Sequence, residues 1–213
     1  YATQVQPLPA AWEAPHSNEL WPRPKRQEPL QGENWSADTK AVFYCAQAEW
    51  RVPLQNAFPK LEFSPDPDSA NVSLELDSTL EQKPEGAYRL TLQDNSARLW
   101  GRDLAGAAYA LQTFQLLLSL ERFEPVKIED WPTLPIRGLM LHTGPQSGGT
   151  HRRLLERAMG PLKMNMLLLE CEYTQWESHP ELWDKNVSIK KSELKKTVEA
   201  ARQNLVEPVP LIQ

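Results

Sequence analysis

Residues 129–141 read Glu-Asp-Trp-Pro-Thr-Leu-Pro-Ile-Arg-Gly-Leu-Met-Leu, and this stretch decides how the chain is divided. Pro132 and Pro135 disfavour regular structure on either side of them. The apolar run from Gly138 to His142 follows and predicts a short strand. We therefore place a boundary here, between one unit at 38–130 and a second at 131–213.

The unit before the boundary has the pattern of an α+β domain. Apolar and polar residues alternate over 72–76, 88–92 and 97–102, which predicts strands, and the turn at 94–96 predicts an antiparallel hairpin. Residues 41–46 read as another strand, and 48–61 as a helix interrupted near Pro53. Asp103 is a candidate cap for a helix at 104–120, whose small residues allow close approach to a sheet. We expect a mostly antiparallel sheet with helices on one face.

Residues 1–37 form a proline-rich arm in which little regular structure is expected. Trp12, Trp21 and Trp35 are candidate anchors on the domain surface. Their alternative role is to stack on sugars.

After the boundary, strands and helices alternate. Strands are expected at 138–142, 164–171 and 209–212, with one helix capped by Thr150 and another from Ser188 or Ser192 to about 204. This order predicts a parallel sheet with right-handed crossovers. Three strands and two helices are too few for a (β/α)8 barrel, so we expect either the first units of an incomplete TIM-type barrel, continued beyond Gln213, or a small open α/β layer.

Composition argues against several partners. The net charge is −5 with no basic block, so we expect no nucleic-acid partner, and no apolar run is long enough for a membrane span. Cys45 and Cys171 lie in apolar stretches and are expected to be buried thiols, with a disulfide left open. The localisation is unknown from the sequence, but a signal peptide removed before Tyr1 would imply a secreted or periplasmic protein.

Several segments, in order, resemble family 20 glycoside hydrolases. Residues 129–141 resemble the entry to that family's catalytic barrel, and the G-x-Y-x-L pattern at 86–90 with the helix at 106–116 resembles the end of its N-terminal domain. Lys163-Met-Asn165 and the strand ending at Gln213 resemble its second and third barrel strands. The resemblance spans about residues 86–213.

The resemblance implies removal of terminal β-linked N-acetylhexosamine by substrate-assisted retention. In that chemistry an Asp orients the substrate acetamide and the adjacent Glu protonates the leaving oxygen. The pair follows the fourth barrel strand, so this chain is expected to lack it and to be inactive alone. No cofactor is implied, and the implied partner is a glycan that contains N-acetylhexosamine.

The strand ends supply the candidate substrate-binding residues, since barrel enzymes place their sites there. The candidates are Glu172, Arg137, His142, Tyr173, Trp176 and Gln213. His142, Pro145, Glu170 and Tyr173 stand where the family has Asp, Arg, His and Asp. Arg137 is expected to form an ion pair at the opposite end of its strand, although family members retain an Arg there near the sugar.

Each candidate also has a structural interpretation. Glu172 could be satisfied by a neighbouring Arg, His142 could be a hydrogen-bonded structural histidine, and Trp176 could pack its own loop. The spacing of His142, Glu170 and Glu172 does not favour a metal site.

Two functional classes remain open: the front portion of a family 20-like glycosidase, and a non-catalytic carbohydrate-recognition or interaction module on the same scaffold. An adjacent Asp-Glu pair after a fourth strand would favour the enzyme. Exposed apolar strand edges make self-association of the fragment a further expectation.

Overall fold

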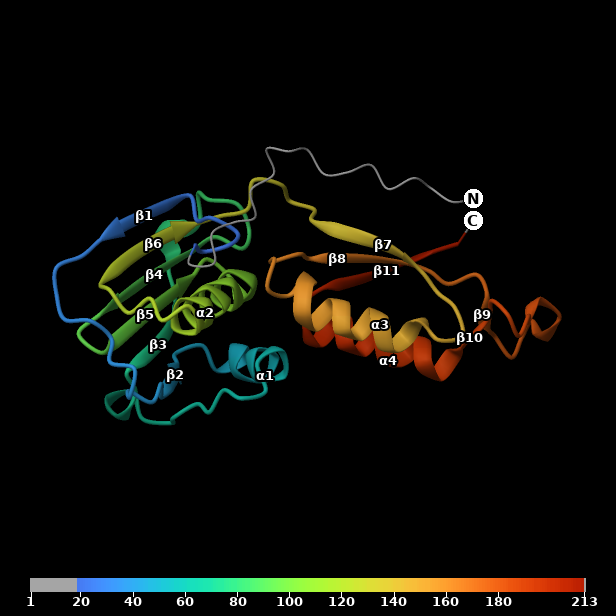
Figure 1. The fold of residues 1–213 in the computed structure, drawn as a ribbon, viewed down its shortest axis with the longest axis horizontal. Coiled ribbons are helices and arrows are strands. Elements are labelled where there is room, and N and C mark those ends of the chain that lie inside the picture. Colours follow the sequence, from blue (N-terminus) through green and yellow to red (C-terminus); the bar gives the residue numbers. More distant parts are fainter. Residues whose placement is uncertain (1–18, 213) are drawn as a thin grey trace.

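The computed structural model describes residues 19–212, so the prediction for Trp12 lies outside the described residues. Two sheets, each with helices on one side, follow one another along the chain (Figure 1). Their hydrophobic residues form two clusters, one drawn from Leu20 to Ile128 and the other from Leu155 to Val206.

The larger sheet has six strands within the described residues, in the order β1-β6-β4-β5-β3-β2. They are β1 (Arg26–Pro29), β2 (Phe43–Cys45), β3 (Val72–Leu76), β4 (Tyr88–Gln93), β5 (Ser96–Gly101) and β6 (Val126–Asp130). The pairs β1–β6, β6–β4 and β4–β5 are antiparallel, whereas the pairs β5–β3 and β3–β2 are parallel. The sheet is therefore mixed, because the helix between β2 and β3 returns the chain to the same end of the sheet.

Two of these strands were missed by the sequence prediction. β1 lies in the proline-rich arm, where little regular structure was expected, and Pro29 is tolerated because β1 is an edge strand. β6 lies at the end of the first unit, directly before the boundary at residue 131, where no strand was predicted. Its residues alternate between buried and half-buried, so Val126 and Ile128 enter the core. Trp35 is buried as expected of an anchor, whereas Trp21 is 52% exposed.

Helices α1 (Ala48–Ala57) and α2 (Leu104–Ser119) cover one face of this sheet (Figure 1). Short 3-10 turns occur at Pro67–Ser69 and Ser78–Leu80. The expected interruption of α1 does not occur: Pro53 lies inside the helix, which continues to Ala57. α2 begins as predicted, with the Asp103 carboxylate accepting a hydrogen bond from the Gly106 amide at 2.8 Å.

The small residues of α2 do permit close packing. A Cβ at Gly106 would lie 2.2 Å from the carbonyl oxygen of Ala87, so only glycine fits there. Phe114 on the same helix makes edge contacts with Trp35 at 5.5 Å and with Phe43 at 6.1 Å between ring centroids. The helix thus holds the N-terminal segment and the sheet in one core.

The smaller sheet has three parallel strands in the order β11-β8-β7. They are β7 (Gly138–His142), β8 (Met166–Glu170) and β11 (Glu207–Leu211).

Helix α3 (Ser147–Leu154) continues as a π-helical turn (Leu155–Met159), and α4 (Lys191–Gln203) connects β8 to β11. α3 begins at Ser147, before the expected cap Thr150, and α4 begins at Lys191 rather than after Ser188 or Ser192. A short strand pair, β9 (Thr174–Gln175) and β10 (Ile189–Lys190), and a 3-10 turn (Pro180–Leu182) lie between β8 and α4.

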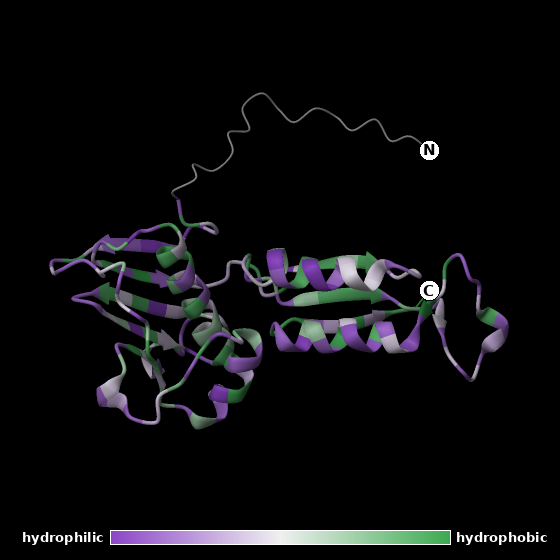
Figure 2. Ribbon diagram, turned by 60° about the horizontal axis from the view of Figure 1, so that its bottom comes forward, coloured by the Kyte–Doolittle hydropathy of each residue, from purple (hydrophilic) through white to green (hydrophobic). Residues whose placement is uncertain are grey.

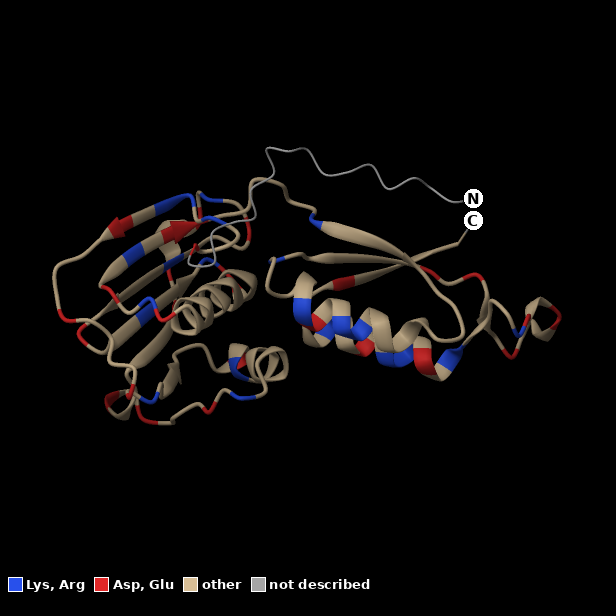
Figure 3. Ribbon diagram, viewed as in Figure 1, with Lys and Arg blue, Asp and Glu red and all other residues tan. Residues whose placement is uncertain are grey.

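The two faces of the smaller sheet differ. α3 and α4 pack on the face that carries Leu167 and Leu169, which are buried (Figure 1). The register places Met140, Leu168 and Val209 in one row on the opposite face, where Met140 is 45% exposed. No other element of the described chain covers that row. Figure 2 shows these strands mostly green, and Figure 3 shows charges concentrated on α3 and α4.

A buried polar contact joins the two units. The Lys163 ammonium, from the turn before β8, donates to the Tyr88 hydroxyl at 2.7 Å and to the Asp130 carboxylate at 3.3 Å. Burial lowers the pKa of Lys163, and the Asp130 charge opposes that shift. Burial also raises the pKa of Tyr88. Residues from β4, β6 and the second unit therefore share one desolvated site.

Candidate functional site

The carboxyl ends of β7 and β8 bring two titratable side chains into contact. His142 and Glu170 are the last residues of their strands and lie opposite one another in the parallel register. The His142 Nδ1 contacts the Glu170 carboxylate. The His142 side chain is 74% exposed and that of Glu170 only 15%, so the carboxylate is largely buried and the imidazole faces the solvent.

A second histidine lies behind this pair. His151 on α3 is buried, and burial lowers its pKa although a hydrogen bond with the His142 backbone acts in the opposite direction. Its Nδ1 atom is buried without a hydrogen-bond partner in the described part of the chain. Sequence reasoning missed His151, although it recurs with Leu154 and Leu155 on the side of α3 that packs inward.

Glu172 and Tyr173 form a turn directly after β8, at the same edge of the sheet. Glu172 is half-buried, and its charge acts to raise the pKa of the neighbouring Cys171 thiol, for which burial is the larger cause. Tyr173 is 45% exposed. The turn is held by the Thr174 amide, which donates to the Cys171 carbonyl at 3.1 Å. The structure therefore places both predicted residues beside the His142–Glu170 pair.

Trp176 follows β9 and is half-buried against the second hydrophobic cluster. Its carbonyl accepts a hydrogen bond from the Trp183 indole at 3.0 Å, and the Lys191 ammonium lies 5.8 Å from its ring centroid. Packing thus fixes its position in the loop, as the structural interpretation expected, and leaves part of the residue exposed.

Arg137 lies at the other end of β7, about five residues or roughly 16 Å of strand away from His142. Its guanidinium donates to the Lys163 carbonyl at 2.8 Å, the Leu134 carbonyl at 2.7 Å and the Tyr109 hydroxyl at 2.8 Å. The expected ion pair is therefore wrong for the described residues, because neutral oxygens take the place of a carboxylate. Gln213 lies outside the described residues.

Other expectations concern sulfur, metals and membranes. Cys45 is buried in the first cluster and Cys171 in the second, as free thiols. Among residues 19–212, no group of three or more His, Cys, Asp or Glu side chains could hold a metal ion. Within the same range, none of the helices combines the length and apolar character needed to cross a membrane.

The site can therefore accept and donate hydrogen bonds along one sheet edge. A carboxylate such as that of Glu172 can accept from paired hydroxyl groups, and the exposed imidazole of His142 presents a further polar group. Tyr173 and Trp176 add aromatic surface on the same loop. Such a mixture of polar and aromatic groups is typical of sites for small polar ligands.

Comparison with known proteins shows which family the sequence matches. The chain matches the family described as "Glycosyl hydrolase family 20, domain 2" over residues 17–131. A curated relative, Beta-hexosaminidase 1 of Coccidioides posadasii, is 26% identical over 162 residues, which is 66% of this chain and 27% of the relative.

Solved structures share the fold. The β-N-acetylhexosaminidase of Bacteroides fragilis superimposes with a TM-score of 0.73 at 20% identity, covering 91% of this chain and 44% of that chain. An exo β-N-acetylglucosaminidase of Vibrio harveyi, solved with N-acetylglucosamine, gives a TM-score of 0.71 at 18% identity, covering 92% and 36%. The chain thus spans less than half the length of these relatives, and identities this low establish the fold alone.

Proposed function

Because this chain belongs to glycosyl hydrolase family 20, we propose that it is the front portion of a β-N-acetylhexosaminidase-like enzyme. The proposed reaction of the whole protein is removal of terminal β-linked N-acetylhexosamine by substrate-assisted retention. In this proposal the first unit is the family's N-terminal domain, and the second begins its catalytic (β/α)8 barrel.

The contact between His142 and Glu170 at the carboxyl ends of β7 and β8 is the observation that carries the proposal. Barrel enzymes build their sites from the loops at this end of the strands. Glu172, Tyr173 and Trp176 belong to the loop that leaves the same edge. We propose that this edge forms one wall of a sugar site.

The uncovered face of the smaller sheet supports the proposal that the second unit begins a (β/α)8 barrel. Parallel sheets are almost always covered on both faces, because their crossover helices and further strands enclose them. Here Met140, Leu168 and Val209 form an apolar row on the face opposite α3 and α4. In a closed barrel this row would face the packed interior.

We propose that the chain 1–213 does not hydrolyse the substrate by itself. It contains no adjacent Asp-Glu pair, and that pair is what the resemblance assigns to acetamide orientation and acid catalysis. The expected result is no release of 4-nitrophenol from 4-nitrophenyl N-acetyl-β-D-glucosaminide above a buffer blank. Measurable turnover would overturn this part of the proposal.

Sugar binding at the edge is tested separately, by titrating N-acetylglucosamine and following the indole NMR signal of Trp176. Glu172→Gln is expected to weaken this binding about tenfold or more, because a hydrogen bond to a charged group is lost. Glu181→Gln is the matched control, since Glu181 is exposed on the same connection and pairs only with His179 among described residues. Equal affinities of the two variants would contradict the proposed role of Glu172.

The second candidate is a carbohydrate-recognition module without hydrolase activity. The residues that favour it are His142 and Glu170, which stand where the family resemblance places Asp and His. The longer protein decides between the two: hydrolysis of the chromogenic substrate supports the enzyme, whereas binding without hydrolysis supports the recognition module.

A further inference from the structure

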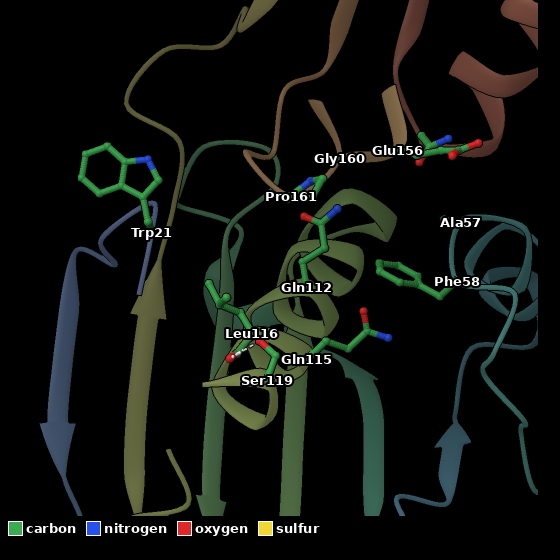
Figure 4. A pocket seen from close by; sticks show the side chains of 11 residues that line it. Trp21, Ala57, Phe58, Gln112, Gln115, Leu116, Ser119, Glu156, Gly160 and Pro161 are labelled. Atoms are coloured by element: carbon green, nitrogen blue, oxygen red, sulfur yellow. Dashed lines mark hydrogen bonds between the residues drawn. The ribbon is translucent and has the colours of Figure 1, made fainter. Parts of the chain in front are cut away.

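A cleft between the two units lies away from the strand-end edge. Its volume is about 390 Å³, and α2 forms its floor with Gln112 and Gln115. Figure 4 shows Phe58, at the end of α1, on one side of these side chains and Trp21 on the other, with Gly160 and Glu156 above them. Both units therefore contribute to one concavity of the size that small ligands occupy.

Gln112 carries the principal polar feature of this cleft. Its Oε1 atom is buried and has no hydrogen-bond partner among the described residues. A buried acceptor left without a donor costs stability, and natural structures seldom keep one without a reason. The terminal torsion of a glutamine side chain is broad, so the amide can turn its oxygen toward a ligand at little cost.

The second unit meets Gln112 at Gly160. A Cβ built on Gly160 would lie 3.7 Å from the Gln112 Nε2 and 3.5 Å from the Asn204 Oδ1. The two amides therefore converge on one corner of the cleft, one from each unit. The π-helical turn Leu155–Met159 precedes this corner, and such turns occur frequently at functional sites.

The lining identifies a chemical class of ligand. Its titratable group is Glu156, and its other polar side chains are neutral: Gln112, Gln115, Ser119 and Asn204. There is no cation in the lining to attract a phosphate or carboxylate. The walls are helices and turns, which present no free strand edge to a peptide. Carbonyl and carboxylate acceptors beside the aromatic rings of Trp21 and Phe58 suit a neutral ligand rich in hydroxyl and amide donors.

We infer that this cleft binds a neutral amide-bearing sugar, an N-acetylhexosamine, at a site separate from the strand-end edge. The ligand's hydroxyl or amide N–H group donates to Gln112, and its ring lies between Trp21 and Phe58. The choice of sugar rests on the proposed function, whereas the site itself rests on the geometry of the cleft.

The test is a titration of the isotope-labelled chain with N-acetylglucosamine, followed through the tryptophan indole NMR signals. Binding in the cleft shifts the Trp21 signal with a Kd on the order of 1 mM, as expected for a ligand of this size. Binding at the strand ends shifts the Trp176 signal instead. The two sites therefore succeed or fail independently.

Gln112→Leu is the decisive variant. Removing the unpartnered acceptor is expected to raise the melting temperature by about 2–4 °C while weakening the Trp21 response at least about tenfold. Gln47→Leu is the matched control, because the Gln47 Oε1 is also buried without a partner but lies at the start of α1. It is expected to stabilise the fold without changing sugar binding.

Gly160→Ala is a second variant, and it is expected to fold. Gly160 has helical backbone angles, and the added methyl group would make ordinary contacts of 3.4–3.7 Å with the Leu155 carbonyl, Asn204 and Gln112. It fills the corner and is expected to weaken the Trp21 response. A Trp21 signal that does not move with sugar, or one that moves equally in Gln112→Leu and the parent chain, overturns the inference.

Discussion

Both sheets are covered by helices on one face, and they differ in the residues on the opposite face. In each sheet, helices cover one face: α1 and α2 on the larger, α3 and α4 on the smaller. The opposite face of the larger sheet carries polar residues such as Arg89, Arg98 and Thr91. In the smaller sheet, the face opposite α3 and α4 carries Met140, Leu168 and Val209.

The opposite face is therefore polar in the larger sheet and apolar in the smaller one. A polar face is stable in water, so the larger sheet needs no further cover. An apolar face on a parallel sheet is expected to pack against another surface, because removing each apolar side chain from water lowers the free energy. The covering helices also differ: α2 has no charged residue, whereas α4 carries lysines, glutamates and an arginine (Figure 3).

The largest expected effect concerns the core of the larger unit. Phe114→Ala removes a fully buried ring that contacts Trp35 and Phe43, and is expected to lower the free energy of unfolding by about 3–5 kcal/mol. Native-state hydrogen exchange would show the loss at the amides of β4 and much less at those of β8.

The matched variant is Leu167→Ala, in the core of the smaller unit. It is expected to lower protection in β8 and leave β4 nearly unchanged. If each variant lowered protection equally in both strands, the two units would share one cooperative core and the comparison would fail.

A smaller effect follows from pH. The folded-state pKa of His151 lies below its ordinary value of 6.5. Below pH 6.5 the unfolded chain therefore binds a proton before the folded chain does, and the stability of the smaller unit falls as the pH falls through that window. His151→Gln is expected to remove this component, as measured by urea unfolding at pH 7 and pH 5.5. The same pH slope in both proteins would refute the assignment.

The smallest effect on stability is expected on the open face. Met140→Ser replaces a side chain that no described element covers, so the free energy of unfolding should change by no more than about 0.5 kcal/mol. It should reduce self-association in sedimentation velocity, because it interrupts an exposed apolar row. Leu92→Ser, in the buried face of β4, is the control and should destabilise strongly. A large loss of stability in Met140→Ser would mean that the face is already covered.

The periodic parts of the fold could be predicted from the sequence. Alternation located β3, β4 and β5, and Asp103 located the start of α2, because burial and capping act on local patterns. β6 has the same alternation, in the sequence Val126-Lys-Ile-Glu-Asp130, but the sequence prediction overlooked it, whereas β1 has no alternation that could locate it. β1 is an exposed edge strand with a proline, and its pairing with β6 joins residues 26–29 to residues 126–129, which no local pattern records.

The candidate site was predictable in its location and less so in its contacts. The rule that sites follow the ends of parallel strands placed His142, Glu172, Tyr173 and Trp176 on one edge. It could not foresee that Arg137 would donate to backbone carbonyls, because those carbonyls become available only where the Pro135 turn meets Lys163. Nor could it identify His151, whose role depends on how α3 packs behind His142.

The contact of Lys163 with Asp130 and Tyr88 has a consequence for how the units are arranged. A buried ion pair gains little net free energy, since desolvation offsets most of the attraction between the charges. An unpaired ammonium in that position would be much less stable, so docking in any other orientation is penalised. The contact therefore favours one orientation of the two units, and it does so partly through Tyr88, which also belongs to the core of the larger unit. Lys163 thus acts together with Arg137, whose guanidinium donates to the Tyr109 hydroxyl at 2.8 Å, in tying the second unit to the first.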